Sequence, residues 1–209
     1  MDGVIVDSHP LHRVAWREFL RMLGKNVDEE SLDFVLDGRT RKEILIHFLG
    51  PLTPQQLEDY GHLKDELLRK LNDEVKTIPG IVEFLAHLSQ AGIRMALATS
   101  ATRRRVEGTL MELGLARYFQ TIVTGDEVDA GKPDPAIYRL AAERLQELPE
   151  HLLAVEDAVS GVKSATAAGM RCMGVASAQR ADALWAAGAD PVIPDFRVLS
   201  LAELAAYVR

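Results

Sequence analysis

The sequence has a single cysteine, no long apolar run and no excess of positive charge. A disulfide needs two cysteines, so Cys172, which lies in the apolar run 170–176, excludes an intrachain disulfide and is expected in a buried strand. No stretch reaches the length that spans a bilayer, and the N-terminus shows no signal-peptide pattern. The net charge of −7 argues against nucleic-acid or membrane partners. These absences predict a cytoplasmic protein, with a monomer as the default.

The 209 residues, 47% of them hydrophobic and 26% charged, suffice for one large core or for a core with a small inserted domain. From residue 10 to about residue 76 the pattern is helical. Apolar residues recur every four positions over 11–23, and Gly24 ends that helix. A capping-box pattern at Thr40 opens a helix over 41–49, and a proline at the first helical position precedes a third over 57–71.

After Thr77 short apolar strands alternate with helices. The predicted strands are 93–98, 121–123, 152–155, 172–175 and 192–193, and the predicted helices are 81–91, 103–113, 135–148, 159–168, a short one at 184–185 and a C-terminal one. Because helices separate the strands without a hairpin signal, we predict an α/β fold with a doubly wound parallel sheet. In such sheets the chemistry gathers beyond the carboxyl ends of the strands.

Polar residues of complementary types occur at four predicted strand ends. They are Asp2 before Gly3, Thr99 and Ser100 after Ala98, Lys132 in the loop after the strand 121–123, and Glu156 and Asp157 after Val155. A carboxylate can move a proton, a hydroxyl at a helix start can hold phosphate oxygens, a lysine can offset charge, and adjacent carboxylates suit Mg²⁺. Each signal alone is more typical of a solvated lysine or a helix cap. Their combination in one sheet favours phosphoryl transfer.

The chain resembles the haloacid dehalogenase superfamily, in the branch that contains β-phosphoglucomutase and small sugar-phosphate phosphatases. The motifs that carry the resemblance are Asp2-Gly3-Val4-Ile5-Val6-Asp7-Ser8, Leu97-Ala98-Thr99-Ser100, Gly131-Lys132-Pro133-Asp134-Pro135 and Val155-Glu156-Asp157. They occur in the family's order, and the similarity spans essentially the whole chain. The resemblance implies a Rossmann-like core over residues 1–9 and 77–209 and an inserted all-α cap over residues 10–76.

The resemblance also implies roles for these residues. Asp2 matches the aspartate that acts as general acid/base, and true dehalogenases generally lack it, so phosphate chemistry is favoured over halide chemistry. Thr99 matches the phosphate-binding hydroxyl, with Ser100 beside it as a substrate contact, and Lys132 matches the charge-stabilising lysine. The Mg²⁺ ligands implied by the family are Asp2, Glu156 and Asp157.

The family's first motif begins with another aspartate, which attacks phosphorus and forms an aspartyl-phosphate. Its position here would lie directly before Met1, at the end of a buried strand. About five buried apolar residues, at roughly 1.5–3 kcal/mol each, would be worth on the order of 10 kcal/mol, which is comparable to the stability of a typical domain. We therefore expect several further residues before Met1. The alternatives are a nucleophile-less phosphate-binding or regulatory protein and, third, a fold whose motifs are relics.

Substrate choice is expected to depend on the cap. His12 matches a histidine at the cap–core contact of the mutase, although an ordinary surface or core histidine explains it equally well. Arg41 falls where the family has a sugar-phosphate-binding arginine, and a planar guanidinium suits a phosphate because it binds bidentately. Lys64 matches a further cap lysine only if a gap is allowed. The run 103–105 of three arginines points in different directions around a helix, and we leave it outside the predicted site.

The predicted function is that of a Mg²⁺-dependent phosphatase that acts on small phosphorylated metabolites such as sugar phosphates. A β-phosphoglucomutase-type phosphomutase remains an alternative, because both classes use the same four motifs.

Overall fold

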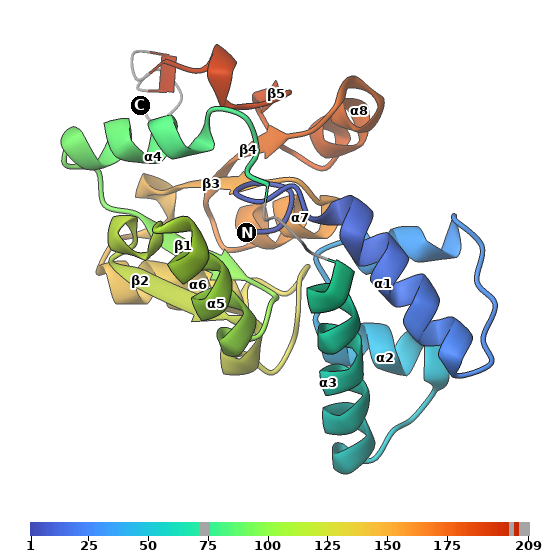
Figure 1. Cartoon of the computed structure of the whole chain (residues 1–209). Helices are drawn as coiled ribbons and strands as arrows, with labels where there is room; N and C mark the ends of the chain where they lie inside the picture. Colours follow the sequence, from blue (N-terminus) through green and yellow to red (C-terminus); the bar gives the residue numbers. More distant parts are fainter. Residues whose placement is uncertain (72–75, 201–202, 205–209) are drawn as a thin grey trace.

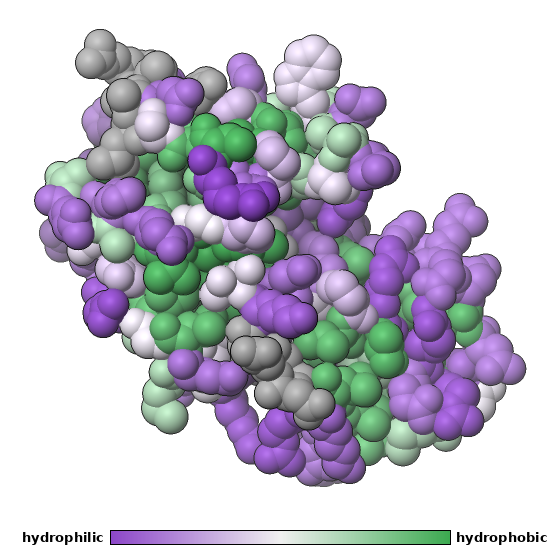
Figure 2. Space-filling model, turned by 45° about the horizontal axis from the view of Figure 1, so that its top comes forward, coloured by the Kyte–Doolittle hydropathy of each residue, from purple (hydrophilic) through white to green (hydrophobic). Residues whose placement is uncertain are grey.

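The computed structural model describes residues 1–71, 76–200 and 203–204. Figure 1 shows a smaller lobe of helices beside a larger lobe in which helices surround strands. In Figure 2 hydrophilic side chains form most of the outline, and apolar side chains are visible inside it on both lobes. None of the helices in the described residues combines the length and apolarity needed to cross a membrane.

The smaller lobe is built by three α-helices and one 3₁₀ helix, namely α1 (His9–Met22), η1 (Ser31–Leu36), α2 (Arg41–Leu49) and α3 (Pro54–Leu71). Trp16, Phe19 and Leu20 of α1 are fully buried in the shared core of this lobe. The predicted capping box at the start of α2 is present: the backbone N–H of Glu43 donates to the Thr40 side chain, and the Glu43 carboxylate accepts from the Thr40 N–H. The three helices predicted for residues 10–71 are therefore confirmed.

The larger lobe holds five strands, namely β1 (Ala96–Thr99), β2 (Thr121–Thr124), β3 (Leu153–Glu156), β4 (Arg171–Val175) and β5 (Val192–Ile193). Every pairing between them is parallel, as predicted: β1 with β2, β3 with β4, and β4 with β5. Their helices are α4 (Ile81–Gln90), α5 (Arg103–Leu113), α6 (Ala136–Leu145), α7 (Val159–Ala167) and α8 (Ala178–Ala186), with short 3₁₀ turns η2 (Ala116–Tyr118), η3 (Gly125–Glu127), η4 (Pro149–His151) and η5 (Phe196–Val198).

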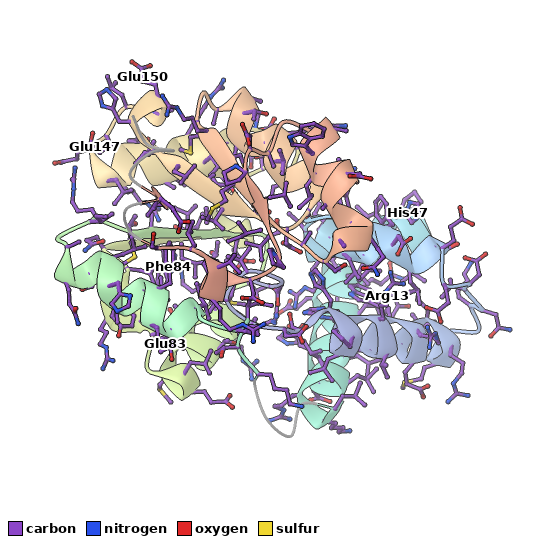
Figure 3. The ribbon with its side chains drawn as sticks, turned by 90° about the horizontal axis from the view of Figure 1, so that it is seen from above. Arg13, His47, Glu83, Phe84, Glu147 and Glu150 are labelled. Carbon is purple, nitrogen blue, oxygen red and sulfur yellow. The ribbon has the colours of Figure 1, made fainter. Side chains whose placement is uncertain are left out.

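Some boundaries differ from the sequence prediction. The strand predicted from Ile93 begins only at Ala96, because Ile93 is exposed beyond the end of α4 and does not pair with β2. Cys172 is buried in β4, as expected. Glu83 lies on the outer side of α4 while Phe84 faces the strands (Figure 3), which explains the apolar period of that helix. The predicted C-terminal helix falls mostly outside the described residues.

The parallel strands form two sheets rather than one. β1 pairs only with β2 in the first sheet, and β3 begins a second sheet that continues through β4 to β5. The first six residues do not run between them as a strand: the N–H of Ile5 donates to the carbonyl of Met1 at 2.8 Å, and the N–H of Gly3 donates to the carbonyl of Val6, which closes a tight turn. Figure 1 places the N-terminus between the two sheets.

An apolar groove of about 570 Å³ separates the two sheets. Its walls include residues 96–98 of β1 and 153–155 of β3, and α4 and α6 contribute further side chains. The groove therefore lies where a single parallel strand would join β1 to β3 and make one continuous sheet.

Candidate active site

The polar strand ends meet in a second cavity of about 110 Å³ between the larger lobe and the helices of the smaller lobe, the region predicted from the sequence to be the cap. Its lining includes every site residue predicted from the sequence, namely Asp2, His12, Arg41, Thr99, Ser100, Lys132, Glu156 and Asp157. Lys64 and Arg105 line it as well. Thr99 ends β1 and Glu156 ends β3, so the carboxyl ends of strands from both sheets face the same cavity.

A buried ion pair forms the floor of this cavity. Lys132, from the loop before α6, donates to Glu156 at the end of β3, and both side chains are only 6% exposed. The hydroxyl of Tyr138 on α6 donates to the same carboxylate oxygen. Burial raises the pKa of Glu156, but the charge of Lys132 and the hydrogen bonds from Lys132 and Tyr138 together outweigh it, and the net pKa is lowered. Burial and the neighbouring Glu156 raise the pKa of Tyr138 well above its ordinary value, so the phenol stays a donor.

Asp157 brings a second carboxylate to the floor. Its Oδ2 atom is buried without a hydrogen-bond partner and lies 3.0 Å from Nε2 of His9. A Cβ atom on Gly3 would lie 2.2 Å from that oxygen, so only glycine, here at φ +64°, lets the N-terminal turn approach so closely. An orphaned buried carboxylate oxygen beside a second carboxylate fits a divalent cation that keeps several waters, such as Mg²⁺.

Asp2, the third predicted metal ligand, has both carboxylate oxygens engaged by other side chains. Its Oδ2 accepts from Nη1 of Arg105 at 2.8 Å, and its Oδ1 accepts from Nη2 of Arg105 and from the Ser8 hydroxyl. Within the described residues no three His, Cys, Asp or Glu side chains form a group that could hold a metal ion. Of the three predicted ligands, Glu156 and Asp157 lie on the floor of the cavity, whereas Asp2 pairs with Arg105.

Two opposing effects determine the ionisation of Asp2. Burial raises its pKa, but the guanidinium of Arg105 holds the pKa well below its usual range. His12 lies nearby, with Nε2 3.5 Å from Oδ1 of Asp2 and Nδ1 3.4 Å from Nζ of Lys64. Burial, followed by the charges of Lys64 and Arg105, lowers the pKa of His12 to about 3, so this histidine is neutral.

The end of β1 supplies hydroxyl groups and a tie to the cap. Thr99 is 3% exposed and its hydroxyl accepts from the Ala101 N–H at 3.3 Å. The Ser100 hydroxyl is used structurally: it donates to the carbonyl of Gly38 in the cap loop at 2.5 Å. Ser160 of α7 binds the same loop, since its N–H donates to the Asp37 carboxylate at 3.1 Å. The cap loop is therefore fastened to the larger lobe on both sides of the cavity.

The cap side of the cavity is positively charged. Arg41 donates through Nη1 to Asp65 at 2.7 Å, and Gly61 leaves room for it, because a Cβ there would lie 2.5 Å from the guanidinium carbon. Lys64 is 4% exposed and its ammonium lies 5.4 Å from the ring centre of Trp16. Burial and then the charge of Arg105 lower the pKa of Lys64 to about 8. Lys64, which matches the family's cap lysine only if a gap is allowed, thus lies beside Arg41 and His12.

The exclusion of the whole arginine run was wrong for Arg105. Arg104 is exposed and Arg103 pairs with Glu127, but Arg105 reaches Asp2. Helical side chains tilt toward the N-terminus of their helix, so a first-turn residue after a strand end points toward the strand-end site. That signal was available in the sequence. Tyr138 was also missed, and nothing in the local pattern distinguishes it from an ordinary core tyrosine.

Comparison with known proteins agrees with this geometry. A family model described as haloacid dehalogenase-like hydrolase matches residues 1–175. The chain is 34% identical over 204 residues to the phosphorylated carbohydrates phosphatase of Thermotoga maritima, covering 96% of this chain and 94% of that protein. It is 31% identical over 189 residues to the β-phosphoglucomutase of Bacillus subtilis, covering 86% and 82%. A solved structure of CbbY from Rhodobacter sphaeroides, a mutant in complex with xylulose-(1,5)bisphosphate, matches with a TM-score of 0.85 at 32% identity, over 98% of this chain and 96% of that one.

The parallel α/β fold and these relatives define an enzyme of the phosphatase or phosphomutase class. The chain belongs to the haloacid dehalogenase-like hydrolase family, in its phosphoglucomutase-like branch.

Proposed function

We propose that this protein is a Mg²⁺-dependent phosphatase that acts on small phosphorylated metabolites such as sugar phosphates. The observation that carries the proposal is the convergence of Lys132, Thr99, Asp2 and the carboxylates of Glu156 and Asp157 on one cavity under the cap. The carbohydrate phosphatase among the relatives supports the substrate class.

In this proposal the Thr99 hydroxyl and the N–H groups at the following turn hold the oxygens of the transferring phosphate. Lys132 offsets the charge that develops on it. Asp2 gives a proton to the leaving sugar oxygen and later takes one from water. A magnesium ion, when bound by Glu156 and Asp157, would neutralise part of the phosphate charge.

The attacking carboxylate is proposed to come from the end of a strand that fills the apolar groove. Met1 lines both the groove and the polar cavity, so the two spaces meet at that residue. A strand parallel to β1 and β3 would run along the groove toward the edge where Asp2 and Lys132 lie. Its last residue would reach the polar cavity next to Met1, where an aspartate could form the aspartyl-phosphate.

The experiment joins a short apolar segment ending in Phe-Asp to Met1 and measures phosphate release from sugar phosphates, phosphoglycolate and nucleotide monophosphates with Mg²⁺. We expect turnover of sugar phosphates in the extended chain and negligible turnover in the 209-residue chain. Asp2→Asn in the extended chain should lower kcat by about 10²-fold or more, while the Kd for inorganic phosphate changes far less. Robust Mg²⁺-dependent turnover by the 209-residue chain, or equal loss of turnover and phosphate binding in Asp2→Asn, would contradict these assignments.

A phosphomutase is the second candidate. Arg41 and Lys64 put two cations at the cap end of the cavity, which suits a second phosphate, and one solved relative carries a bisphosphate. The same assay separates the two functions when the sugar products are resolved: a mutase returns an isomeric sugar phosphate, and a phosphatase returns free sugar and inorganic phosphate. A nucleophile-less binding protein would bind phosphate in the 209-residue chain without releasing either product.

A further inference from the structure

Asp157, one of the two carboxylates on the floor of the polar cavity, is contacted from a helix that carries none of the four motifs. Arg180 is the third residue of α8, and its Nη2 donates to the Asp157 carbonyl at 3.0 Å. Its other terminal nitrogen, Nη1, lies 3.3 Å from Nδ1 of His9. Nε2 of the same His9 ring lies 3.0 Å from Oδ2 of Asp157. Arg180 therefore reaches the main chain of Asp157 directly and its carboxylate through one imidazole ring.

The contact with Arg180 determines which nitrogen of His9 carries the proton. A guanidinium can only donate, so Nδ1 of His9 accepts from Nη1. In a neutral imidazole the proton then lies on Nε2, the atom that faces Asp157. Oδ2 of Asp157 has no hydrogen-bond partner in this structure, although Nε2 lies within hydrogen-bond distance of it. Contacts of this kind in active sites often tighten only when the site is occupied.

A carboxylate that binds a metal ion is usually held by a further hydrogen bond. Each carboxylate oxygen has two lone pairs, so Oδ2 of Asp157 can accept from His9 and still bind a cation. A His9 ring with its proton on Nδ1 would instead turn the lone pair of Nε2 toward Oδ2, and the two lone pairs would repel each other. His9 is also the first residue of α1, so the same contact joins the start of the smaller lobe to the proposed cation site.

We propose that Arg180 is a positioning residue that acts on the Asp157 carboxylate through His9. Arg180 keeps the proton of His9 on Nε2, and that proton holds the carboxylate in the orientation in which it binds the cation. The inference rests on the proposed function, because it takes Asp157 as a ligand of the cation. Loss of Arg180 should therefore weaken cation binding, although Arg180 itself does not touch the cation.

The first test measures binding of Mn²⁺, which suits oxygen ligands as Mg²⁺ does, to the metal-free 209-residue chain by isothermal titration. Hydrogen-bond partners of metal ligands are worth about 10- to 100-fold in affinity, so Arg180→Met should raise the Kd of Mn²⁺ by about tenfold or more. Arg180→Lys should fall in between, because a lysine donates from a single point and lacks the fork that reaches both His9 and Asp157.

Arg139→Met is the matched control. Arg139 is also an exposed helical arginine that donates to a main-chain carbonyl, that of Ala167 at 3.5 Å. Because it does not contact His9 or Asp157, its loss should change the Kd of Mn²⁺ by about twofold or less.

A second set of variants separates the route through His9 from the contact with the main chain. In His9→Gln the side-chain amide can donate to Asp157 and has no tautomers. Arg180→Met should therefore raise the Kd of Mn²⁺ much less in the His9→Gln chain than in the unaltered chain. In the metal-free chain at mildly alkaline pH, the ¹⁵N signals of the His9 ring, identified as those that His9→Gln removes, should show the proton on Nε2. Arg180→Met should give a mixture of both tautomers, and Arg139→Met should not.

Three results would overturn the proposal alone. They are a His9 proton on Nδ1 in the unaltered chain, an Mn²⁺ affinity of Arg180→Met equal to that of Arg139→Met, and an equal effect of Arg180→Met in the unaltered and His9→Gln chains. The last result would restrict Arg180 to its main-chain contact. If Mn²⁺ does not bind the unaltered chain, the proposed cation site fails together with this inference. If Arg180→Met does not fold, as judged by its thermal unfolding, Arg180→Lys compared with Arg139→Lys decides the affinity comparison.

Discussion

The two cavities that meet at Met1 differ in size and in the polarity of their lining. The polar cavity holds about 110 Å³, and most of its charged groups pair with one another, as Lys132 does with Glu156 on the floor and Arg41 with Asp65 on the cap side. The apolar groove holds about 570 Å³ between the facing edges of β1 and β3. The predicted site residues therefore all lie around one cavity within the described residues. Beside that cavity the groove separates the two sheets that carry them.

The two cavities show that the site depends on polar contacts, whereas the joining of the two sheets depends on apolar packing. The groove leaves apolar side chains of both sheets without packing partners, and burying about five further apolar side chains there would be worth on the order of 10 kcal/mol. That is comparable to the net stability of a whole domain. The polar side chains keep their geometry because hydrogen bonds and ion pairs hold them directly. The strand ends that carry them are positioned by each of the two sheets separately.

The largest expected effect is that of filling the groove. An apolar segment of about five residues ending in Asp, joined to Met1, should raise the free energy of unfolding by several kcal/mol, up to on the order of 10 kcal/mol. Urea unfolding measures the change. A matched segment ending in Asn should stabilise equally but give no phosphate release. A segment that leaves the urea midpoint unchanged would show that the groove does not accept a strand.

The second-largest expected loss of stability comes from removing one charge of the buried ion pair in the polar cavity. Lys132→Met leaves the Glu156 carboxylate buried without its cation, which should cost about 3–5 kcal/mol of stability. Adding Glu156→Gln should recover part of that loss, because the uncompensated charge is removed. Lys163→Met, at an exposed position, serves as the control and should change stability by about 0.5 kcal/mol or less. A loss in Lys132→Met no larger than in the control would mean that the pair is solvated.

Tyr138 connects the two cavities, because it lines the groove while its hydroxyl donates to Glu156, which lines the polar cavity. Tyr138→Phe keeps the ring and removes only the polar contact. Since hydrogen bonds to charged groups contribute about 1.5–3 kcal/mol, we expect a loss in that range by urea unfolding. The same change in a chain that already carries Glu156→Gln should cost less. Equal losses in both backgrounds would show that the Tyr138 hydroxyl contributes to stability independently of the charge on Glu156.

The sequence was sufficient to predict the site residues that directly follow strands. It was insufficient to predict contacts between residues that lie far apart in the chain. Thr99, Lys132 and Glu156 are fixed by local order, because parallel strands bring their carboxyl ends together wherever the sheet forms. For Arg105 the place in the first turn after β1 was a usable signal, but nothing in the sequence paired it with Asp2, 103 positions away. The split into two sheets was missed as well, since the strand patterns are intact and only the spacing between β1 and β3 records it.

The smallest effect concerns His12 and depends on pH. Its pKa is lowered to about 3 in the folded chain, so between about pH 6.5 and pH 3 the unfolded chain binds the extra proton and stability falls on acidification. The slope is about 1.4 kcal/mol per pH unit below the unfolded pKa. Between about pH 7.5 and pH 5.5 the stability advantage of the unaltered chain over His12→Gln should therefore shrink by about 1.4 kcal/mol.

Urea unfolding at both pH values measures this difference, and His62→Gln provides the control, because the His62 side chain is 54% exposed. The control should keep nearly the same stability difference from the unaltered chain at both pH values, since an exposed imidazole is solvated in both states. A constant difference for His12→Gln as well would show that protonated His12 is tolerated beside Lys64 and Arg105. In that case the cap side of the cavity would have to hold more negative charge than Asp2 and Asp65 provide. The charged groups of the polar cavity would then not balance one another, and the difference between this cavity and the unfilled groove would be smaller than argued above.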